Sequence, residues 1–293
     1  MPSWDPDVYA DFAAERARPF TDLVARIGAG GAGSDGDVVH GVVRRVVDLG
    51  CGPGDQTATL ARRWPDAEVV GVDSSESMIE RAERQATGEL RGRLRFELAD
   101  VVDWVPDQPV DVIVTNALLQ WVPGHLALLP RLMQSVAPGG WFAMQVPGNF
   151  SAISHQAMRD LTQDRRFFDR LQGVLRGTES VAQPSTYASL LAETGATVDV
   201  WETTYLHVLD PEGRFGDDAV LAWVSGTGLR PVLDVLADDP PLRQAFLDSY
   251  SAALRKAYPR KRWGTLLPFR RVFAVAHRPV DVVPGRRTWQ EGA

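Results

Sequence analysis

The sequence is poor in the residues that build disulfides, zinc sites and membrane spans. It has one cysteine, Cys51, and five histidines among 293 residues. A single cysteine allows no disulfide within the chain, which suits a reducing compartment, and no Cys/His cluster offers a zinc site. No apolar run approaches the length of a membrane helix, and residues 1–6 lack the charged and apolar regions of a signal peptide. We therefore expect a cytoplasmic protein without a metal centre.

Basic charge is also in short supply. The chain has 31 Lys and Arg against 38 Asp and Glu, which gives a formal net charge of −7. This balance argues against broad attraction to nucleic acid or to an anionic membrane. Apolar residues make up 44% of the chain and charged residues 24%, as is typical of a globular enzyme. The length suits one large domain or a domain with an inserted lid.

The most informative stretch is residues 44–54, where an apolar strand runs into a turn with glycine at three alternate positions. A helical pattern follows over 56–64. Glycine is favoured where the backbone turns tightly or approaches a ligand closely, and this order of elements opens nucleotide-binding α/β domains. A nicotinamide fingerprint would need glycine at position 55, where the chain has Asp55. The acid-x-G-x-G-x-G pattern that begins at Asp48 instead resembles motif I of class I S-adenosylmethionine (SAM) methyltransferases.

Polar side chains also follow the next three predicted strands. The second strand ends at Asp73, about 20 residues past the turn, where such folds hydrogen-bond a ribose diol. A carboxylate suits two vicinal hydroxyls because it accepts both bonds at once. The third strand leads to Asp100, which can accept a bond from an adenine amino group, and the fourth leads to Asn116. Asp73 alone is explained equally well as an acid in the first turn of a helix, whereas the ordered set favours a SAM site.

The rest of the pattern predicts an α/β fold: a doubly wound, Rossmann-like sheet with an added helical layer. Strands alternate with helices up to residue 146, which implies parallel pairing with right-handed crossovers. Residues 151–183 and 211–265 read as a mainly helical cap, on either side of a β-branched strand at 197–207. A last apolar run lies at 272–276. We therefore expect a seven-stranded sheet with N-terminal helices and a helical lid inserted between strands six and seven.

These elements form one expected domain over 1–278, with a loose C-terminal tail over 279–293 and a glycine-rich surface loop at 28–41. The predicted strands span about 43–49, 68–73, 93–98, 110–115, 141–146, 197–207 and 272–276. The predicted helices span about 10–18, 19–27, 56–64, 76–85, 126–136 and 184–195.

Several segments are similar to those of the trans-aconitate 2-methyltransferase family. They are residues 4–9, 16–19, 48–54, 71–75, 78–79, 116–121, 145–149, 200–205 and 223–231. The segments 116–121 and 223–231 are the most specific, because cofactor binding alone does not require them. The resemblance covers about residues 1–278 and departs in the glycine loop and in the tail.

The resemblance implies the seven-stranded class I methyltransferase topology, which ends in an antiparallel pair. It also implies transfer of a methyl group from SAM to one carboxylate of trans-aconitate by a monomeric enzyme, giving a monomethyl ester and S-adenosylhomocysteine. The cofactor-binding residues it implies are Asp48, Gly50, Gly52, Gly54, Asp73, Ser74, Met78, Asp100, Val101, Asn116 and Trp121. The substrate-binding residues it implies are Trp4, Tyr9, Arg16, Gln120, Asn149 and Arg230. A carboxylate is already ionised at neutral pH, so we expect positioning only and no catalytic base.

The substrate's carboxylates need positive or hydrogen-bonding partners if they are buried, and arginine offers planar bidentate pairing. Arg230 is the first candidate, because it lies in the predicted lid beside a glycine turn. Arg16 is the second, and Arg18 is a weaker choice. A single arginine in a sequence is more often a solvated surface side chain.

Three other functions stay open on the sequence alone. The first is a SAM-dependent methyltransferase of another small carboxylic or hydroxylated metabolite, for which His125 or His155 would be the ready source of a base. The second is a nicotinamide oxidoreductase, which Asp55 disfavours. The third is a SAM-binding sensor without enzymatic activity, against which the inserted lid argues only weakly.

Overall fold

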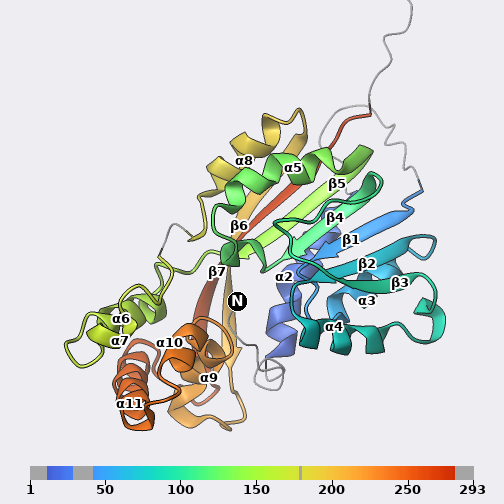
Figure 1. Ribbon diagram of the computed structural model, residues 1–293. Helices are drawn as coiled ribbons and strands as arrows, with labels where there is room; N and C mark the ends of the chain where they lie inside the picture. Colours follow the sequence, from blue (N-terminus) through green and yellow to red (C-terminus); the bar gives the residue numbers. More distant parts are fainter. Residues whose placement is uncertain (1–11, 29–41, 178–179, 281–293) are drawn as a thin grey trace, which may run out of the picture.

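The computed structural model describes residues 12–28, 42–177 and 180–280, which form one seven-stranded sheet with flanking helices (Figure 1). The strand order is β3-β2-β1-β4-β5-β7-β6. Strands β1 to β5 are parallel, and β7 lies antiparallel between β5 and β6. The predicted α/β fold is therefore confirmed, including its antiparallel last pair. The glycine loop and nearly all of the predicted tail lie outside the described residues.

The elements have the following bounds. The strands are β1 (Arg45–Leu49), β2 (Glu68–Asp73), β3 (Leu94–Leu98), β4 (Val110–Asn116), β5 (Val136–Pro147), β6 (Thr197–Leu209) and β7 (Thr265–His277). The α-helices are α2 (Ala13–Ala25), α3 (Asp55–Arg63), α4 (Glu76–Ala82), α5 (Leu129–Gln134), α6 (Ile153–Thr162), α7 (Phe168–Leu171), α8 (Pro184–Ala192), α9 (Ala219–Ser225), α10 (Arg230–Val235) and α11 (Pro240–Ala257). Short 3₁₀ turns are η1 (Glu83–Gln85), η2 (Gly88–Leu90), η3 (Leu119–Trp121), η4 (His125–Leu128) and η6 (Gly216–Asp218).

Helices cover both faces of the sheet. Helices α2 and α3 pack on one face through Leu23 and Leu60, and α5 and α8 pack on the other through Leu132 and Tyr187. Because both faces are covered, the inner strands are apolar nearly throughout, as parallel strands in α/β folds usually are. In β1, every residue after Arg45 is buried.

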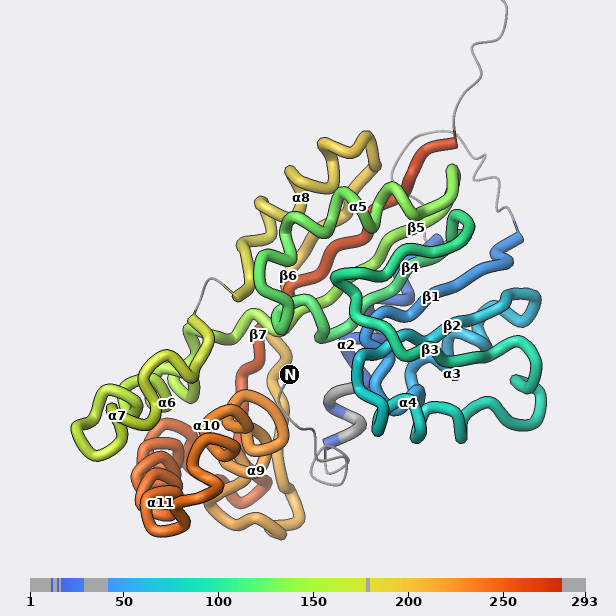
Figure 2. The backbone as a smooth tube through the Cα atoms, viewed as in Figure 1, coloured from blue at the N-terminus to red at the C-terminus, as the bar shows by residue number. Residues whose placement is uncertain are grey.

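The last two strands are longer than the sheet that they complete. β7 pairs with β6 along its whole length, from Thr265 to His277, whereas its pairing with β5 covers only residues 271–277. Residues 204–209 and 265–270 therefore continue as a two-stranded ribbon beyond the sheet, which can be followed in Figure 2.

The ribbon carries a helical cap, made of α6, α7, α9, α10 and α11, that lies to one side of the sheet in Figure 1. Helices α9 to α11 come between β6 and β7 in the chain, as predicted, and α6 and α7 follow β5. The cap has its own apolar core around Phe167, Trp223 and Phe246, which also takes in Leu267 and Phe269 of the ribbon. The cap thus joins the sheet through its own hydrophobic contacts with β7.

The prediction of two N-terminal helices that meet at Pro19 was wrong. A single helix, α2, runs through Pro19. Proline inside a helix removes one backbone hydrogen bond and costs about 3 kcal/mol. Phe20, Leu23 and Val24 of the same helix are buried against the sheet, and burial of three large apolar side chains at about 1.5–3 kcal/mol each outweighs that cost.

Three other boundaries differ from the prediction. The predicted helix at 126–136 is divided into the 3₁₀ turn η4 and the helix α5. Pro130 lies in the first turn of α5, where proline is tolerated. Strand β5 begins at Val136 rather than at 141, and the glycine turn at 138–140 is accommodated as an irregularity in the pairing with β4. The ribbon likewise extends β7 back to residue 265.

Candidate active site

The glycine turn lies at the carboxyl end of β1, as the sequence predicted. Gly50 and Gly54 both have positive φ angles, 75° and 82°, which favour glycine. A Cβ at Gly50 would lie 2.8 Å from the Cβ of Leu118, and one at Gly54 would lie 2.8 Å from the ring of Phe96. The two positions therefore combine a left-handed backbone with no room for a side chain, which keeps the turn tight at the start of α3.

Asp48 lies beneath this turn rather than on its open side. Its side chain is 2% exposed, and its Oδ2 accepts a hydrogen bond from Thr57 Oγ1 of α3 at 2.7 Å. Burial raises the pKa of Asp48 to about 7, and the nearby charge of Asp73 acts in the same direction. The Asp48 side chain thus links β1 to α3, and its role in cofactor binding stays a prediction.

Asp73 stands at the carboxyl end of β2 with its carboxylate fixed by backbone groups. Its Oδ2 accepts a bond from the Gly52 amide and its Oδ1 from the Ser75 amide, each at 2.9 Å. Each carboxylate oxygen has a further lone pair, so the oriented group can still accept from two vicinal hydroxyls. This arrangement fits the ribose of SAM.

The ends of β3 and β4 add polar groups to the same edge of the sheet. β3 ends at Leu98, so Asp100 lies two residues beyond it, where its Oδ1 accepts a bond from the Val102 amide at 2.9 Å. Asn116 ends β4 and donates to Gln56 at 2.9 Å. Its buried Oδ1 has no hydrogen-bond partner among the described residues, and a buried acceptor of this kind is satisfied by a ligand or by water.

The chain turns sharply after β4 and so connects the cofactor edge to a cavity. Ala117 has a φ of 57°, an uncommon conformation for a residue with a Cβ. The turn η3 follows and places Gln120 and Trp121 on the cavity wall. Strained backbone often marks functional sites, and this turn lies between Asn116 and the cavity.

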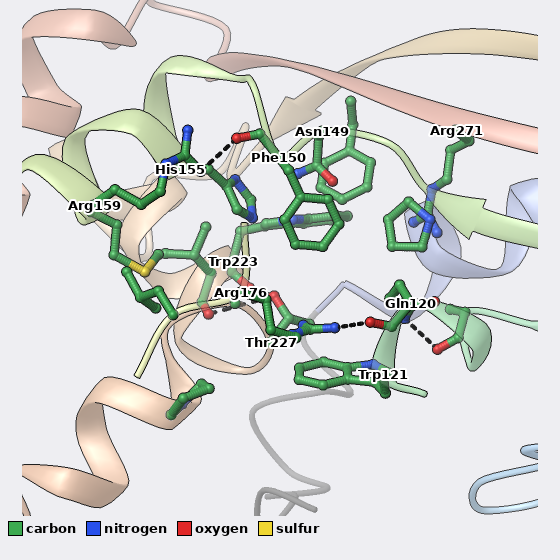
Figure 3. Close-up of a pocket in the computed structure, with 18 residues that line it drawn as sticks. Gln120, Trp121, Asn149, Phe150, His155, Arg159, Arg176, Trp223, Thr227 and Arg271 are labelled. Atoms are coloured by element: carbon green, nitrogen blue, oxygen red, sulfur yellow. Dashed lines mark hydrogen bonds between the residues drawn. The ribbon is translucent and has the colours of Figure 1, made fainter. Parts of the chain in front are cut away.

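The cavity has a volume of about 120 Å³ and lies between the carboxyl ends of β4 and β5 and the helical cap (Figure 3). A dry cavity of about 150 Å³ holds a benzene molecule, so a cavity of this size is on the scale of a small molecule and not of a polymer. Asn149 and Phe150 follow β5 and line it from one side, and Trp223 and Thr227 line it from the cap. Ligands of open α/β sheets bind at this end of the strands.

Three arginines line the cavity, whereas no acidic residue is among the described residues that line it. Arg159 belongs to α6 and donates to the carbonyl oxygen of Phe150 at 2.7 Å. Arg176 lies 3.5 Å above the ring centre of Trp121 and donates to the carbonyl oxygen of Gln120. Burial lowers the pKa of Arg176 to about 10, so it remains charged at neutral pH.

The third arginine, Arg271, comes from β7. It is 5% exposed and donates to Gln145 Oε1 at 3.2 Å. Sequence reasoning missed all three arginines. Arg271 did carry a signal, because strand alternation places it in phase with Phe269 and Phe273 on a buried face, where an arginine is rare. No periodicity or motif pointed to Arg159 or Arg176.

His155 lies among these cations and stays neutral at physiological pH. Burial lowers its pKa to about 4, and the charges of Arg159 and Arg176 contribute in the same direction. Its Nδ1 lies 3.3 Å from Ser154 Oγ. The other candidate base, His125, lies buried against the hydroxyl of Tyr187 at 2.9 Å and does not line the cavity.

The predicted substrate residues divide into three groups. Gln120 and Asn149 line the cavity, together with Trp121 from the predicted cofactor set. Arg230 does not line it: its side chain forms an ion pair with Asp234 at 3.2 Å, while its neighbour Pro231 lines the cavity. Adjacent residues of a helix point about 100° apart, which explains this difference.

The remaining substrate predictions fall outside what the structure describes. Trp4 and Tyr9 lie outside the described residues, and so does the side chain of Arg16, whose backbone is part of α2. Met78 and Val101 of the cofactor set are buried. Ser74 follows Asp73 at the cofactor edge and is exposed. All of these residue roles stay predictions.

The fold and the polar edge of the sheet define a SAM-dependent methyltransferase of class I. A family model described as a methyltransferase domain matches residues 46–140. Solved structures support the fold: the YcgJ protein of Bacillus subtilis has a TM-score of 0.52 at 13% identity, covering 81% of this chain and 93% of that one. A putative sarcosine dimethylglycine methyltransferase from Galdieria sulphuraria has a TM-score of 0.52 at 15% identity, covering 95% and 92%.

Sequence relatives narrow the class. The chain is 53% identical over 280 residues to a trans-aconitate 2-methyltransferase of Streptomyces coelicolor, covering 95% of this chain and 88% of the relative. It is 45% identical to one of Rhodococcus jostii, covering 93% and 98%, and 43% identical to one of Mycobacterium tuberculosis H37Ra, covering 93% and 96%. The chain therefore belongs to the trans-aconitate 2-methyltransferase family. Within the described ranges, no helix is long and apolar enough to cross a membrane.

Proposed function

We propose that this protein transfers the methyl group of SAM to one carboxylate of trans-aconitate and releases S-adenosylhomocysteine. The observation that supports this function best is the cavity beside the cofactor edge, with three arginine side chains and no acidic side chain among its described lining residues. Arginine is suited to bind carboxylates because its planar guanidinium donates two parallel hydrogen bonds. The names of the relatives point to the same substrate.

The residues that hold the cofactor in this proposal are those at the carboxyl ends of β1 to β4. The fixed carboxylate of Asp73 binds the ribose hydroxyls, and the tight turn at Gly50 and Gly54 lets the backbone approach the amino acid part closely. Asn116 has a buried Oδ1 that a ligand donor satisfies. SAM held by these residues would supply an electrophilic methyl group.

The reaction needs alignment rather than proton transfer. A carboxylate oxygen of the substrate gives an electron pair to the methyl carbon, the bond between that carbon and sulfur breaks, and sulfur keeps the electron pair. The carboxylate is ionised at neutral pH, so no proton has to be removed. The walls made by Trp121, Phe150 and Trp223 exclude water, and the arginines orient the substrate. Holding the reacting atoms in line contributes roughly 7–11 kcal/mol.

His155 bears on the choice between a carboxylate and a hydroxyl as the methyl acceptor. A hydroxyl would need a base near the reacting oxygen. His155 is the only histidine among the described residues that line the cavity, and its pKa of about 4 makes it a poor acceptor for a hydroxyl proton. This supports a carboxylate nucleophile over a hydroxylated metabolite.

The test is the release of S-adenosylhomocysteine from SAM with trans-aconitate, in parallel with cis-aconitate, citrate and isocitrate. We expect turnover with a marked preference for trans-aconitate and a methyl ester as the product by mass spectrometry. Tight SAM binding without turnover of any of the four acids would exclude this substrate class and leave another metabolite as the acceptor.

A further inference from the structure

Two of the cavity's arginines, Arg159 and Arg176, lack a carboxylate partner within the described part of the chain. Arg159 reaches the cavity from α6, and Arg176 reaches it from the segment after α7. Each one donates a single hydrogen bond to a backbone carbonyl, that of Phe150 or that of Gln120, and forms no ion pair with a described acidic residue. A guanidinium has five N–H donors, so most donors of both side chains remain for a ligand.

Both side chains are held in place on the cavity wall. Arg176 lies over two aromatic rings, with its guanidinium carbon 3.5 Å from the ring centre of Trp121 and 5.5 Å from that of Phe150. Arg159 is fixed by its bond to the Phe150 carbonyl. Figure 3 shows the two guanidinium groups on either side of Phe150, with His155 near them. The two cations are therefore orientated before a ligand arrives, which reduces the entropy lost on binding.

The electrostatics of this wall favour an anion. Arg159 and Arg176 both lower the pKa of His155, so both lie near the same imidazole. Burial also lowers the pKa of Arg176 itself. Two like charges that share a partly buried wall with a neutral histidine and no described acid are unfavourable until a counter-charge binds. A ligand carboxylate between them supplies that counter-charge.

The chemistry decides which carboxylate belongs there. The reacting oxygen has to give up an electron pair, and its carboxylate becomes a neutral ester. Ion pairs with two arginines would stabilise the charged reactant and be lost on the way to the product, which raises the barrier. A carboxylate that stays ionised throughout keeps both ion pairs in the transition state, so its binding energy serves orientation instead.

We propose that Arg159 and Arg176 form a clamp that holds a carboxylate that the enzyme does not methylate. This inference rests on the proposed function and deepens it, because the substrate must then carry a second carboxylate remote from the reacting one. Monocarboxylic acids are accordingly poor substrates.

The test combines variants of the clamp with substrates that lack one carboxylate. Glutaconate, methylfumarate and itaconate each correspond to trans-aconitate with a different carboxylate removed. The variants are Arg159→Met and Arg176→Met, and the matched control is Arg165→Met, an exposed arginine of the same cap segment that does not line the cavity. kcat/KM is measured for all four acids, and the inhibition constant against trans-aconitate is used for any acid that is not turned over.

We expect each clamp variant to lower kcat/KM for trans-aconitate by about 10- to 100-fold, the usual loss for hydrogen bonds to a charged group. One dicarboxylate should have a kcat/KM with the wild-type enzyme that is lower than that of trans-aconitate by a similar factor. Its kcat/KM should fall little further in the variants, because this acid lacks the clamped carboxylate. The other two should lose as much as trans-aconitate does. The Arg165→Met control should match the wild type, and all proteins should bind S-adenosylhomocysteine equally in calorimetry.

Two results would overturn the clamp while leaving the proposed function intact: variants as active as the wild type, or an equal loss for all four acids. A wild-type enzyme that turns over none of them would instead contradict the proposed function. In that case, calorimetry of trans-aconitate with the S-adenosylhomocysteine complex still decides about the clamp, which requires binding by the wild type and at least tenfold weaker binding by both variants.

Discussion

At the scale of single residues, Asp73 makes the most direct prediction about the cofactor. Its two oxygens are orientated by the Gly52 and Ser75 amides. Asp73→Ala should weaken the binding of S-adenosylhomocysteine by about 10- to 100-fold, because the ribose loses hydrogen bonds to a charged acceptor. Calorimetry measures the dissociation constant, with Asp66→Ala, an exposed acid just before β2, as the control. Equal affinity of the Asp73 variant and the wild type would remove the ribose assignment.

Asp48 makes a prediction about stability and pH. Its pKa is about 7 in the folded protein and about 3.9 in an unfolded chain. Between about pH 4 and 7 the folded protein therefore binds one proton at Asp48 that the unfolded chain does not bind. The contribution of this proton to the free energy of unfolding is complete below about pH 4 and is lost as the pH rises through 7. Between pH 6 and 8 the wild type should lose about 1 kcal/mol of unfolding free energy that Asp48→Asn does not lose.

Urea unfolding of the ligand-free protein at a series of pH values measures this difference. Asparagine is nearly isosteric with aspartate and can still accept the bond from Thr57. Curves for the wild type and the Asp48→Asn variant that run parallel from pH 6 to 8 would show that the Asp48 carboxyl is ionised throughout this range.

The residues of the cavity show where a sequence stops being informative. Asp48, Asp73 and Asn116 were predicted because each lies at or near the carboxyl end of a strand, and parallel strands bring these ends together. Arg159 belongs to the cap helix α6 and Arg176 to the irregular segment after α7, and the place of both in space depends on how the cap packs on the sheet. Arg230 was predicted to bind the substrate because of the residues beside it in the sequence, yet its side chain forms an ion pair with Asp234 of the same helix. The direction of this side chain depends on how α10 is rotated about its axis, which the sequence alone does not show.

At the scale of elements, the same distinction separates the sheet from the ribbon. The strands β1, β2 and β4 are built around short apolar runs, whereas β3 alternates between apolar and charged residues. The ends of all four strands were predicted to within a residue or two. The first half of β7 alternates between buried and exposed residues, because the ribbon has the cap on one side only. The sequence predicted only the continuous apolar run at 272–276, so the strand's start at 265 was not recognised without its partner β6.

Helix α11 is the longest helix of the described cap, and its start depends on one side chain. Asp239 Oδ1 accepts a hydrogen bond from the Leu242 amide at 3.0 Å, and two prolines fill the first turn. Asp239→Ala should lower the free energy of unfolding by about 1 kcal/mol, the usual effect of losing an N-cap. Chemical denaturation measures it, with Asp248→Ala on the exposed face of the same helix as the control.

The control variant should change stability by less than about 0.5 kcal/mol, as exposed substitutions generally do. Activity with saturating substrates should be retained in both variants, since neither residue lines the cavity. An Asp239 variant as stable as the wild type would mean that water or another group caps the helix equally well.

At the scale of the whole molecule, the protein consists of a sheet with a core on each face and a cap with a third core. The cavity lies between them, and its walls come from β7, from the turn after β4 and from cap helices. Arg176 crosses this boundary through its contacts with Gln120 and Trp121. A substrate in the cavity therefore touches both parts, whereas the cofactor edge belongs to the sheet alone.

This division makes a prediction that hydrogen exchange can test. S-Adenosylhomocysteine alone should slow exchange in the glycine turn and at the start of α4. Adding trans-aconitate should also slow exchange in α6 and α9, which line the cavity, but not in α5, which lies on the far face of the sheet. At a ligand concentration of a hundred times the dissociation constant, amides that exchange only through a ligand-free opening should exchange about 100-fold more slowly.

Protection of the cap by trans-aconitate would support the expectation that residues 1–278 work as one domain. Protection restricted to the sheet would place the substrate outside the cavity, because a ligand between Arg159 and Arg176 cannot bind without restraining α6.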